Sequence, residues 1–400
     1  KDKLTGDWSH KEYNTGAWGG IIRLQDAKLE TERRDASLSL TGKNKKDDYM
    51  IRTFYSKMDK FRFLPYTALA KETGETNTYS VWGIEAKNSH KINGSHTLTY
   101  GTEYDRYLVE GVNFGKSGDN GKDVNTYAAY IQDEWLAGNK WIIIPVLIAG
   151  GYDKHSEFGS KTTPHLGVTY LLNDNNRFKA NWGKGFKAPT VSELYMDYTH
   201  MGVLTMGNPD LQPEESTNWD VSYEGEWGKT FGKVTYFHNT IDNMISTHSV
   251  SGMRGVSEYY NIDGTTKTHG IELTLGRNLS KRWDIKATSN WTSASNKSAS
   301  AASSAHGVDG IADNITTLQL TYDDHKTSGY NFTIWEQWVN NYYESDSNDK
   351  YTYNTLNFVV NRKFNDRFRL FAGVDNIFDK KIDEIYLDGR IWRAGMEYRF

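Results

Sequence analysis

The feature that most constrains this chain is an alternation of apolar and polar residues that repeats along almost its whole length. In the segment 390–400, Trp392 and Met396 fall on one face, while Arg393 and Glu397 fall on the other. A strand places alternate side chains on opposite faces, whereas a helix needs apolar residues spaced by about 3.6. The alternation therefore predicts β-strands, and its repetition predicts an all-β protein.

About eighteen segments carry this pattern, each roughly ten residues long, which is the length of a tilted strand that crosses a membrane. The predicted strands are 17–27, 30–42, 48–58, 77–88, 95–107, 124–136, 140–152, 163–172, 177–186, 216–227, 231–243, 266–277, 282–292, 311–322, 328–338, 353–361, 366–376 and 390–400.

The links between these segments alternate between short and long. The long links are 59–76, 108–123, 187–215, 244–265, 293–310 and 339–352. Bacterial outer-membrane barrels have short periplasmic turns and long outer loops. Suppose that the strand ending at Phe400 points to the periplasm. Counting the predicted strands backwards from it then places every short link on the periplasmic side. A soluble β-sandwich has no reason to sort its loops by length, and a propeller would repeat a blade motif at fixed period.

Composition agrees with a wall that has one wet face and one aromatic face. The mean hydropathy is −0.72, yet the chain holds 26 Tyr, 13 Trp and 16 Phe. The longest apolar run, 141–149, is interrupted by Pro145 and is far shorter than the ~20 residues of a spanning helix. Any membrane span must therefore be built from strands. We predict a transmembrane antiparallel up-and-down β-barrel over residues 1–400, in contact with outer-membrane lipid.

Charge and cysteine content exclude other classes. The net charge is −4 and no basic block exists, which argues against a nucleic-acid partner. The absence of cysteine removes disulfides, thiolate metal sites and cysteine nucleophiles. An outer-membrane enzyme would need a Ser–His–acid set, and no spacing marks one, so we expect no enzyme.

Four segments resemble the carboxy-terminal half of TonB-dependent outer-membrane receptors. They read GKGFKAP at 183–189 followed by Glu193-Leu194-Tyr195, GNPDLQPEE at 207–215, VDNIFDK at 374–380 and GMEYRF at 395–400. Segments 127–135 and 163–167 also fit the pattern. The resemblance implies a receptor in the bacterial outer membrane that imports a scarce nutrient, with energy from TonB–ExbB–ExbD delivered through a plug domain.

The chain differs from the family in two respects, its plug domain and its number of strands. Members of the family carry an amino-terminal plug inside a barrel of about 22 strands, and no plug motif is recognisable here. An open sheet of eighteen strands would leave two unpaired edges, which lipid penalises. We therefore expect a split receptor whose plug-bearing companion chain completes the barrel; a trimmed fragment or a smaller closed barrel are the alternatives.

The resemblance is closest to haem receptors in the loop 187–215. There, similar motifs flank a histidine that ligates haem iron, and the step from Phe186 to His200 has the same spacing. Lys187 replaces the usual arginine. A neutral imidazole is a normal axial haem ligand. The residues expected to bind ligand are His200, Tyr195, Tyr198, Met201, Phe186, Lys187, Asn208 and Asp210, with His200 as the ligand to haem iron.

Three alternatives stay open at this stage. Relatives that bind cobalamin or ferric siderophores carry the same bracketing motifs, so the ligand need not be haem. A chain without a plug could also act as a passive diffusion pore. Finally, Asp346, Asn348 and Asp349 form a polar loop whose oxygens could hold Ca²⁺.

Overall fold

The computed structural model of the 400-residue chain describes residues 2–13, 22–64, 73–111, 121–153, 160–200, 203–253, 255–296, 308, 310–324, 326–344 and 349–399. Within these ranges no helix is long and apolar enough to cross a membrane. The helical elements described are α1 (Val191–Tyr195) and a single 3-10 turn, η2 (Asp383–Ile385).

One sheet of eighteen strands makes up most of the described chain. Its strands are β1 (Asp2–Tyr13), β2 (Ile22–Lys43), β3 (Asp47–Leu64), β4 (Thr73–Lys91), β5 (His96–Gly111), β6 (Gly121–Ala137), β7 (Trp141–Asp153), β8 (Ser160–Asn173), β9 (Asn176–Lys187), β12 (Glu214–Trp227), β13 (Thr230–Asp242), β16 (Thr265–Asn278), β17 (Trp283–Asn296), β18 (Ala312–Asp324), β19 (Tyr330–Glu344), β20 (Asp349–Lys363), β21 (Phe368–Asp375) and β22 (Ile391–Tyr398).

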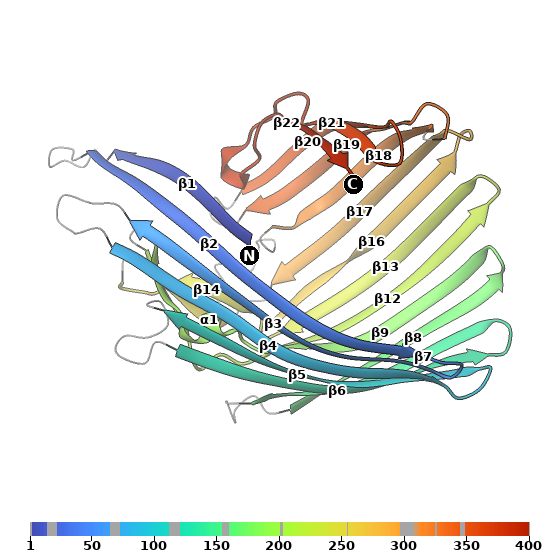
Figure 1. Cartoon of the computed structure of the whole chain (residues 1–400), viewed down its shortest axis with the longest axis horizontal. Coiled ribbons are helices and arrows are strands. Elements are labelled where there is room, and N and C mark those ends of the chain that lie inside the picture. Colours follow the sequence, from blue (N-terminus) through green and yellow to red (C-terminus); the bar gives the residue numbers. More distant parts are fainter. Residues whose placement is uncertain are drawn as a thin grey trace.

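Each of these strands pairs antiparallel with the next one along the chain, and β9 pairs with β12 and β13 with β16 across longer connections. Figure 1 shows the tilted strands curling round as the wall of an incomplete barrel. Among the residues that the structure describes, no pairing joins β1 to β22. The predicted all-β, antiparallel, up-and-down architecture is confirmed, and the sheet is not closed into a ring.

The first two predicted strands were wrong. Residues 22–43 form the single strand β2, so the separate strands 17–27 and 30–42 do not exist; residues 14–21 lie outside the described part. The first strand is instead β1, whose register against β2 runs from Asp2↔Arg33 to Tyr13↔Ile22. The sequence 2–13 has few apolar residues in alternation, so its pairing is set by the adjacent strand. One strand, β1, was therefore missed, and one strand, β2, was predicted as two.

The strands near the amino terminus are much longer than predicted. β2 has 22 residues, β3 has 18 and β4 has 19, against the 9–11 or so that a tilted strand needs to cross a bilayer. Much of the predicted outer loop 59–76 is therefore strand, because β3 continues to Leu64 and β4 begins at Thr73. The sheet extends beyond the membrane at its outer end.

The alternation sorts side chains onto two faces as predicted. In β9, the exposed Phe178 and Trp182 lie on one face, and Arg177 and Lys179 on the other both bind Glu224 of β12, at 2.6 and 2.9 Å. Large apolar side chains are exposed on the first face all round the wall, including Trp82, Tyr127, Trp141, Trp219 and Trp291. This face is the lipid-facing side and the charged face is the lumen.

Glu336 departs from this sorting. It lies on the lipid-facing side of β19, opposite Leu318 of β18 and Leu356 of β20, and accepts a hydrogen bond of 2.7 Å from Asn354. A carboxylate on the lipid face is unfavourable. We expect Glu336→Leu to raise the free energy of unfolding in lipid vesicles by about 1 kcal/mol, as measured by urea titration.

The matched control is Gln337→Leu, which changes the adjacent lumen-facing residue of the same strand. This substitution should give no stabilisation, because its side chain faces the polar interior. If the two leucine variants change stability equally, the assignment of the faces in β19 is incorrect.

Candidate functional site

A second, small sheet stands at the outer end of the wall. Its strands β10 (Asp197–His200), β11 (Val203–Met206), β15 (Val256–Asn261) and β14 (Ile245–Ser249) are ordered β10-β11-β15-β14, and β11 and β15 run parallel. They come from the predicted long loops 187–215 and 244–265. The two predicted long loops therefore fold together into one structure.

Helix α1 opens the first of these loops. Glu193 N–H donates to the Thr190 hydroxyl at 3.2 Å, and Thr190 N–H donates to the Glu193 carboxylate at 2.6 Å. This reciprocal capping box satisfies backbone donors at the start of the helix. A helix of five residues is not stable by itself, so the cap and the packing of Val191 and Leu194 hold it in place.

The apolar cluster that anchors α1 lies on the lumen face of the wall. Leu194 and Leu211 are each 1% exposed and pack with Val109 of β5 and Val124 of β6. Since α1 follows β9, the loop reaches back past β8 and β7 to strands β6 and β5. Burial of each such side chain contributes about 1.5–3 kcal/mol, which makes this cluster the main apolar anchor of the folded loops.

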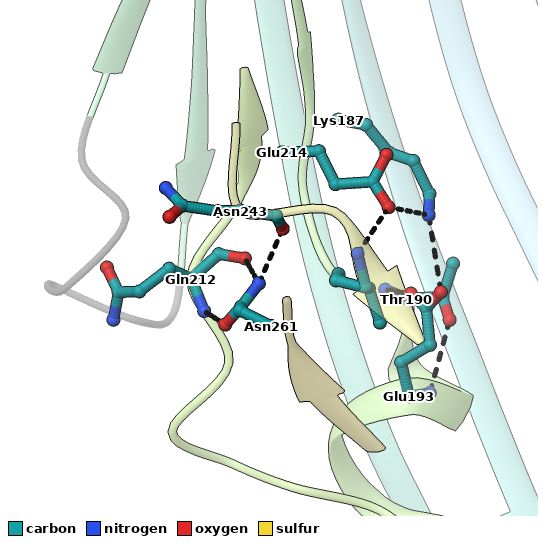
Figure 2. A network of polar contacts seen from close by, with 8 residues as sticks. Lys187, Thr190, Glu193, Gln212, Glu214, Asn243 and Asn261 are labelled. Carbon is teal, nitrogen blue, oxygen red and sulfur yellow. Dashed lines mark hydrogen bonds and ion pairs between the residues drawn. The ribbon is translucent and has the colours of Figure 1, made fainter. Parts of the chain in front are cut away.

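A charged network ties the loop to two strands. The Lys187 ammonium lies 3.0 Å from Glu214 and 3.3 Å from Glu193, as Figure 2 shows. Burial by itself would lower the pKa of Lys187, but its hydrogen bond to Glu214 and the charge of Glu193 outweigh burial and raise the pKa. The same Glu214 carboxylate accepts the Ile245 N–H at 3.0 Å. Lys187 thus links β9 to α1 and β12 through its two ion pairs. The hydrogen bond from Ile245 to Glu214 links β14 to the same network.

Amide side chains make the remaining links between the two loops. Asn208 Nδ2 donates to the Tyr259 carbonyl at 2.9 Å, and its Oδ1 accepts the Asp210 N–H at 2.9 Å. Asn261 Nδ2 donates to the carbonyls of Gln212 and Asn243 at 2.8 and 2.7 Å, a bridge visible in Figure 2. The loops are therefore joined through half-buried and exposed polar contacts as well as through the small sheet.

The structure separates the residues that the sequence grouped as ligand-binding. Tyr195 is half-buried beside Lys122, whose Nζ lies 5.6 Å from the ring centroid, and burial raises the pKa of Tyr195. Tyr198 lies close enough to Tyr79 of β4 to interact with it electrostatically. These two predicted residues therefore gather at the lumen wall.

The other predicted residues lie elsewhere. Phe186 shares the lipid-facing side with Trp182, whereas Lys187 faces inward; Asp210 is exposed. His200 is the last residue of β10, where its backbone pairs with Val203. The His200 side chain and Met201 lie outside the described part of the structure, so their roles stay predictions.

Several residues of the site were not singled out from the sequence. Glu193 and Glu214 stood in the quoted motifs without an assigned role, and both now serve as acceptors. Asn261 contacts Gln212, which is 49 residues away, and no local signal marks such a partner. Asn243 adopts a positive φ of 56°, which asparagine tolerates better than most residues.

The predicted Ca²⁺ loop stays untested. Asp346 and Asn348 lie outside the described residues, and Asp349 begins β20. Across the described ranges, no group of three or more His, Asp or Glu side chains is arranged to hold a metal ion.

Comparison with known proteins places the chain in a family. The model of the TonB dependent receptor-like β-barrel matches residues 2–377. The chain belongs to this family. Its members reside in the bacterial outer membrane, which confirms the predicted location.

Curated relatives match parts of the chain. The vitamin B12 transporter BtuB of Photobacterium profundum is 32% identical over 126 residues, which cover 31% of this chain and 20% of that protein. The iron-regulated outer membrane virulence protein of Vibrio cholerae is 26% identical over 219 residues, covering 51% and 33%. The matched region is thus no more than a third of either relative.

Solved structures share the fold. The ferric enterobactin receptor PfeA of Pseudomonas aeruginosa gives a TM-score of 0.73 at 16% identity, covering 94% of this chain and 62% of that one. The siderophore receptor PirA of Acinetobacter baumannii gives 0.71 at 18%, covering 94% and 63%. At these identities the likeness establishes the fold alone, and the chain spans less than two thirds of either receptor.

Gly207 provides a test of the packing between the loop and α1. A Cβ there would lie 2.6 Å from the Tyr195 nitrogen and 2.7 Å from the Leu194 carbonyl carbon, and neither backbone atom can turn aside. Such overpacking costs about 1–3 kcal/mol. We expect Gly207→Ala to speed hydrogen exchange at the amides of α1 and Asn208 roughly five- to 150-fold.

The control is Gly94→Ala, where nothing lies within 4 Å of the added Cβ. This variant should exchange like the wild type throughout the outer loops. Unchanged exchange in Gly207→Ala would show that α1 does not pack on this residue.

Proposed function

We propose that this chain forms the barrel wall of an outer-membrane transporter that imports a large metal-containing nutrient with energy delivered through TonB. The observation that carries the proposal is the combination of a lipid-facing aromatic exterior, a charged lumen and two outer loops that fold together against the lumen face of the wall. An iron chelate or a corrinoid is the cargo class, since the relatives are named as a vitamin B12 transporter and an iron-regulated protein.

In this proposal the wall carries out no bond chemistry. The folded loops receive the ligand at the mouth, and TonB–ExbB–ExbD acts on a plug domain to open the path. The unpaired edges of β1 and β22 would be costly in lipid. We propose that strands from another segment, in the same or in a companion polypeptide, pair with these edges and bring the plug.

Uptake separates this proposal from a passive pore. In cells that lack the protein, the complete receptor should restore accumulation of radiolabelled ferric siderophore or cyanocobalamin, and removal of TonB should abolish it. The purified receptor should show no open conductance in planar bilayers. Uptake that persists without TonB, together with steady conductance, would establish a diffusion pore instead.

Haem is the second candidate, favoured by the position of His200. This residue ends β10, and its backbone pairs with Val203 at the start of β11. If its imidazole ligates haem iron, haemin should give a Soret shift with the wild type, and His200→Ala should remove the shift. The control is His248→Ala, an exposed histidine of β14 that contacts the Tyr260 ring. An unchanged spectrum in His200→Ala rules out His200 as the ligand.

A further inference from the structure

An apolar groove lies on the lipid-facing side of the wall, where strands β8, β9, β12 and β13 run side by side (Figure 1). Its volume is about 540 Å³. Aromatic and aliphatic side chains form most of its surface, among them Tyr170, Phe178, Val221, Tyr223 and Tyr236. A groove with such a lining favours a hydrocarbon occupant, because polar groups would lose their hydration there.

A row of amphipathic rings crosses the same face just outside the groove. Trp182 of β9 pairs with Trp219 of β12, Trp219 pairs with His238 of β13, and His238 pairs with His269 of β16. The Trp219 and His238 rings stack with their centroids 5.7 Å apart, and the two imidazole centroids lie 5.9 Å apart. Rings with an apolar body and a polar atom are typical of the boundary between membrane and water.

Two lysines lie one step further out on this face. Lys184 of β9 pairs with Thr217, and Lys267 of β16 pairs with Thr240. Lys184 is exposed and Lys267 is half-buried. With the residues that the structure describes, neither ammonium group forms an ion pair or a hydrogen bond. Their strands are three strand spacings apart, roughly 14 Å, so the two cations border one continuous strip.

The carboxylates nearest to this strip already have partners. Glu215 of β12 lies 2.6 Å from the Lys161 ammonium, and Asp242 of β13 accepts the Thr265 hydroxyl at 2.6 Å. Both carboxylates belong to positions closer to the outer rim than the lysines. At the level of the lysines, the intervening residues are neutral threonines. The strip therefore carries positive charge that the described residues do not neutralise.

Height in the membrane decides which groups meet these cations. Thr217, which shares the level of Lys184, is about ten residues along β12 from Trp227 at the periplasmic turn. For a strand tilted by about 40°, this separation corresponds to a height of roughly 25 Å, which is also the height of the apolar band of outer-membrane barrels. The lysines therefore lie where the headgroups of the outer leaflet begin, and the groove lies among the acyl chains beneath them.

We propose that this face binds a phosphorylated lipid of the outer leaflet. An acyl chain occupies the groove, and the headgroup phosphates accept hydrogen bonds from Lys184, Lys267 and the two imidazoles. Charge complementarity favours this occupant over a second copy of the chain, because a symmetric contact through the strip would bring its lysines together. The site lies outside the barrel, so it does not depend on the identity of the cargo.

The headgroup contacts are tested with lipid A, an acylated sugar that bears two phosphates, and the complete receptor in detergent. Native mass spectrometry should show saturable retention of lipid A by the wild type. Lys184→Gln combined with Lys267→Gln should weaken binding by roughly 30-fold, since each lysine loses its attraction to phosphate. The matched control combines Lys87→Gln and Lys286→Gln, two exposed lysines on the lumen face of β4 and β17, and should bind like the wild type.

The groove is tested with the same probe. Ala180→Phe places a ring in the groove and should weaken binding of lipid A by about tenfold, because the acyl chain loses apolar contact. Ala129→Phe makes the same change on the lipid-facing side of β6, away from the groove, and should leave binding unchanged. Inorganic phosphate, which has no acyl chain, should not displace the lipid.

The inference is wrong if the Lys184 and Lys267 double variant binds lipid A as tightly as the wild type. It is also wrong if the wild type binds the same acylated sugar equally well without its phosphates, a comparison that needs no variant to fold. Displacement of the lipid by inorganic phosphate would indicate a simple anion site and overturn the lipid assignment. A dimer that retains no lipid would assign this face to a second copy and overturn it as well.

Discussion

The constraint on which the rest of this structure depends is that lipid offers no hydrogen-bond partner to a peptide backbone. The strands meet it by pairing each with the next in an antiparallel sheet of eighteen, so that N–H and C=O groups are satisfied between neighbours. The alternation of side chains follows from the same arrangement, since each strand must present one face to lipid and one to the lumen. The strands can extend beyond the bilayer without breaking the ladder, and β2 to β4 do so. The outer rim is therefore a continuation of the wall, on which the loops can fold.

The outer loops are stabilised differently from the wall. They lie in water, so they can bury apolar side chains in a core of their own. Leu194 and Leu211 are buried against Val109 and Val124, and in the part of the chain that the structure describes this small cluster most resembles the interior of a soluble domain. The polar network then fixes the geometry: Lys187 lies between two carboxylates, and Asn261 joins the backbones of two loops. Two residues expected to bind ligand, Lys187 and Asn208, are used in this network. Their contacts join the folded loops to the wall and to each other, and a direct role in ligand binding stays a prediction.

Local alternation was enough to predict most of the wall. The predicted strand 216–227 lies within β12 (Glu214–Trp227), and 231–243 nearly coincides with β13 (Thr230–Asp242). Prediction failed where pairing overrides composition: β1 has a weak pattern of its own, and its register is set by β2. It failed again in the loops, because β10, β11, β14 and β15 are strands only through one another. No pattern within 197–206 indicates that Leu204 will pair with Val256, and the apolar cluster that anchors α1 joins two strands to a loop that is distant in the sequence.

The difference in predictability between the wall and the loops bears on how ligand specificity is encoded in the sequence. The alternation that specifies the wall is repetitive and says nothing about the cargo, so a shared fold is compatible with ligands as different as corrinoids and iron chelates. In the proposed transport function, specificity comes from lumen-facing positions near the folded loops, such as Val124 and Thr126. A single change of side-chain volume at Ala188 or Val124 would alter the packing beneath the loops without disturbing strand pairing, since neither change affects a backbone hydrogen bond. The sequence of the wall and the sequence of the site can therefore vary independently. For this physical reason the strands of the wall can be predicted from alternation, whereas the residues of the site cannot.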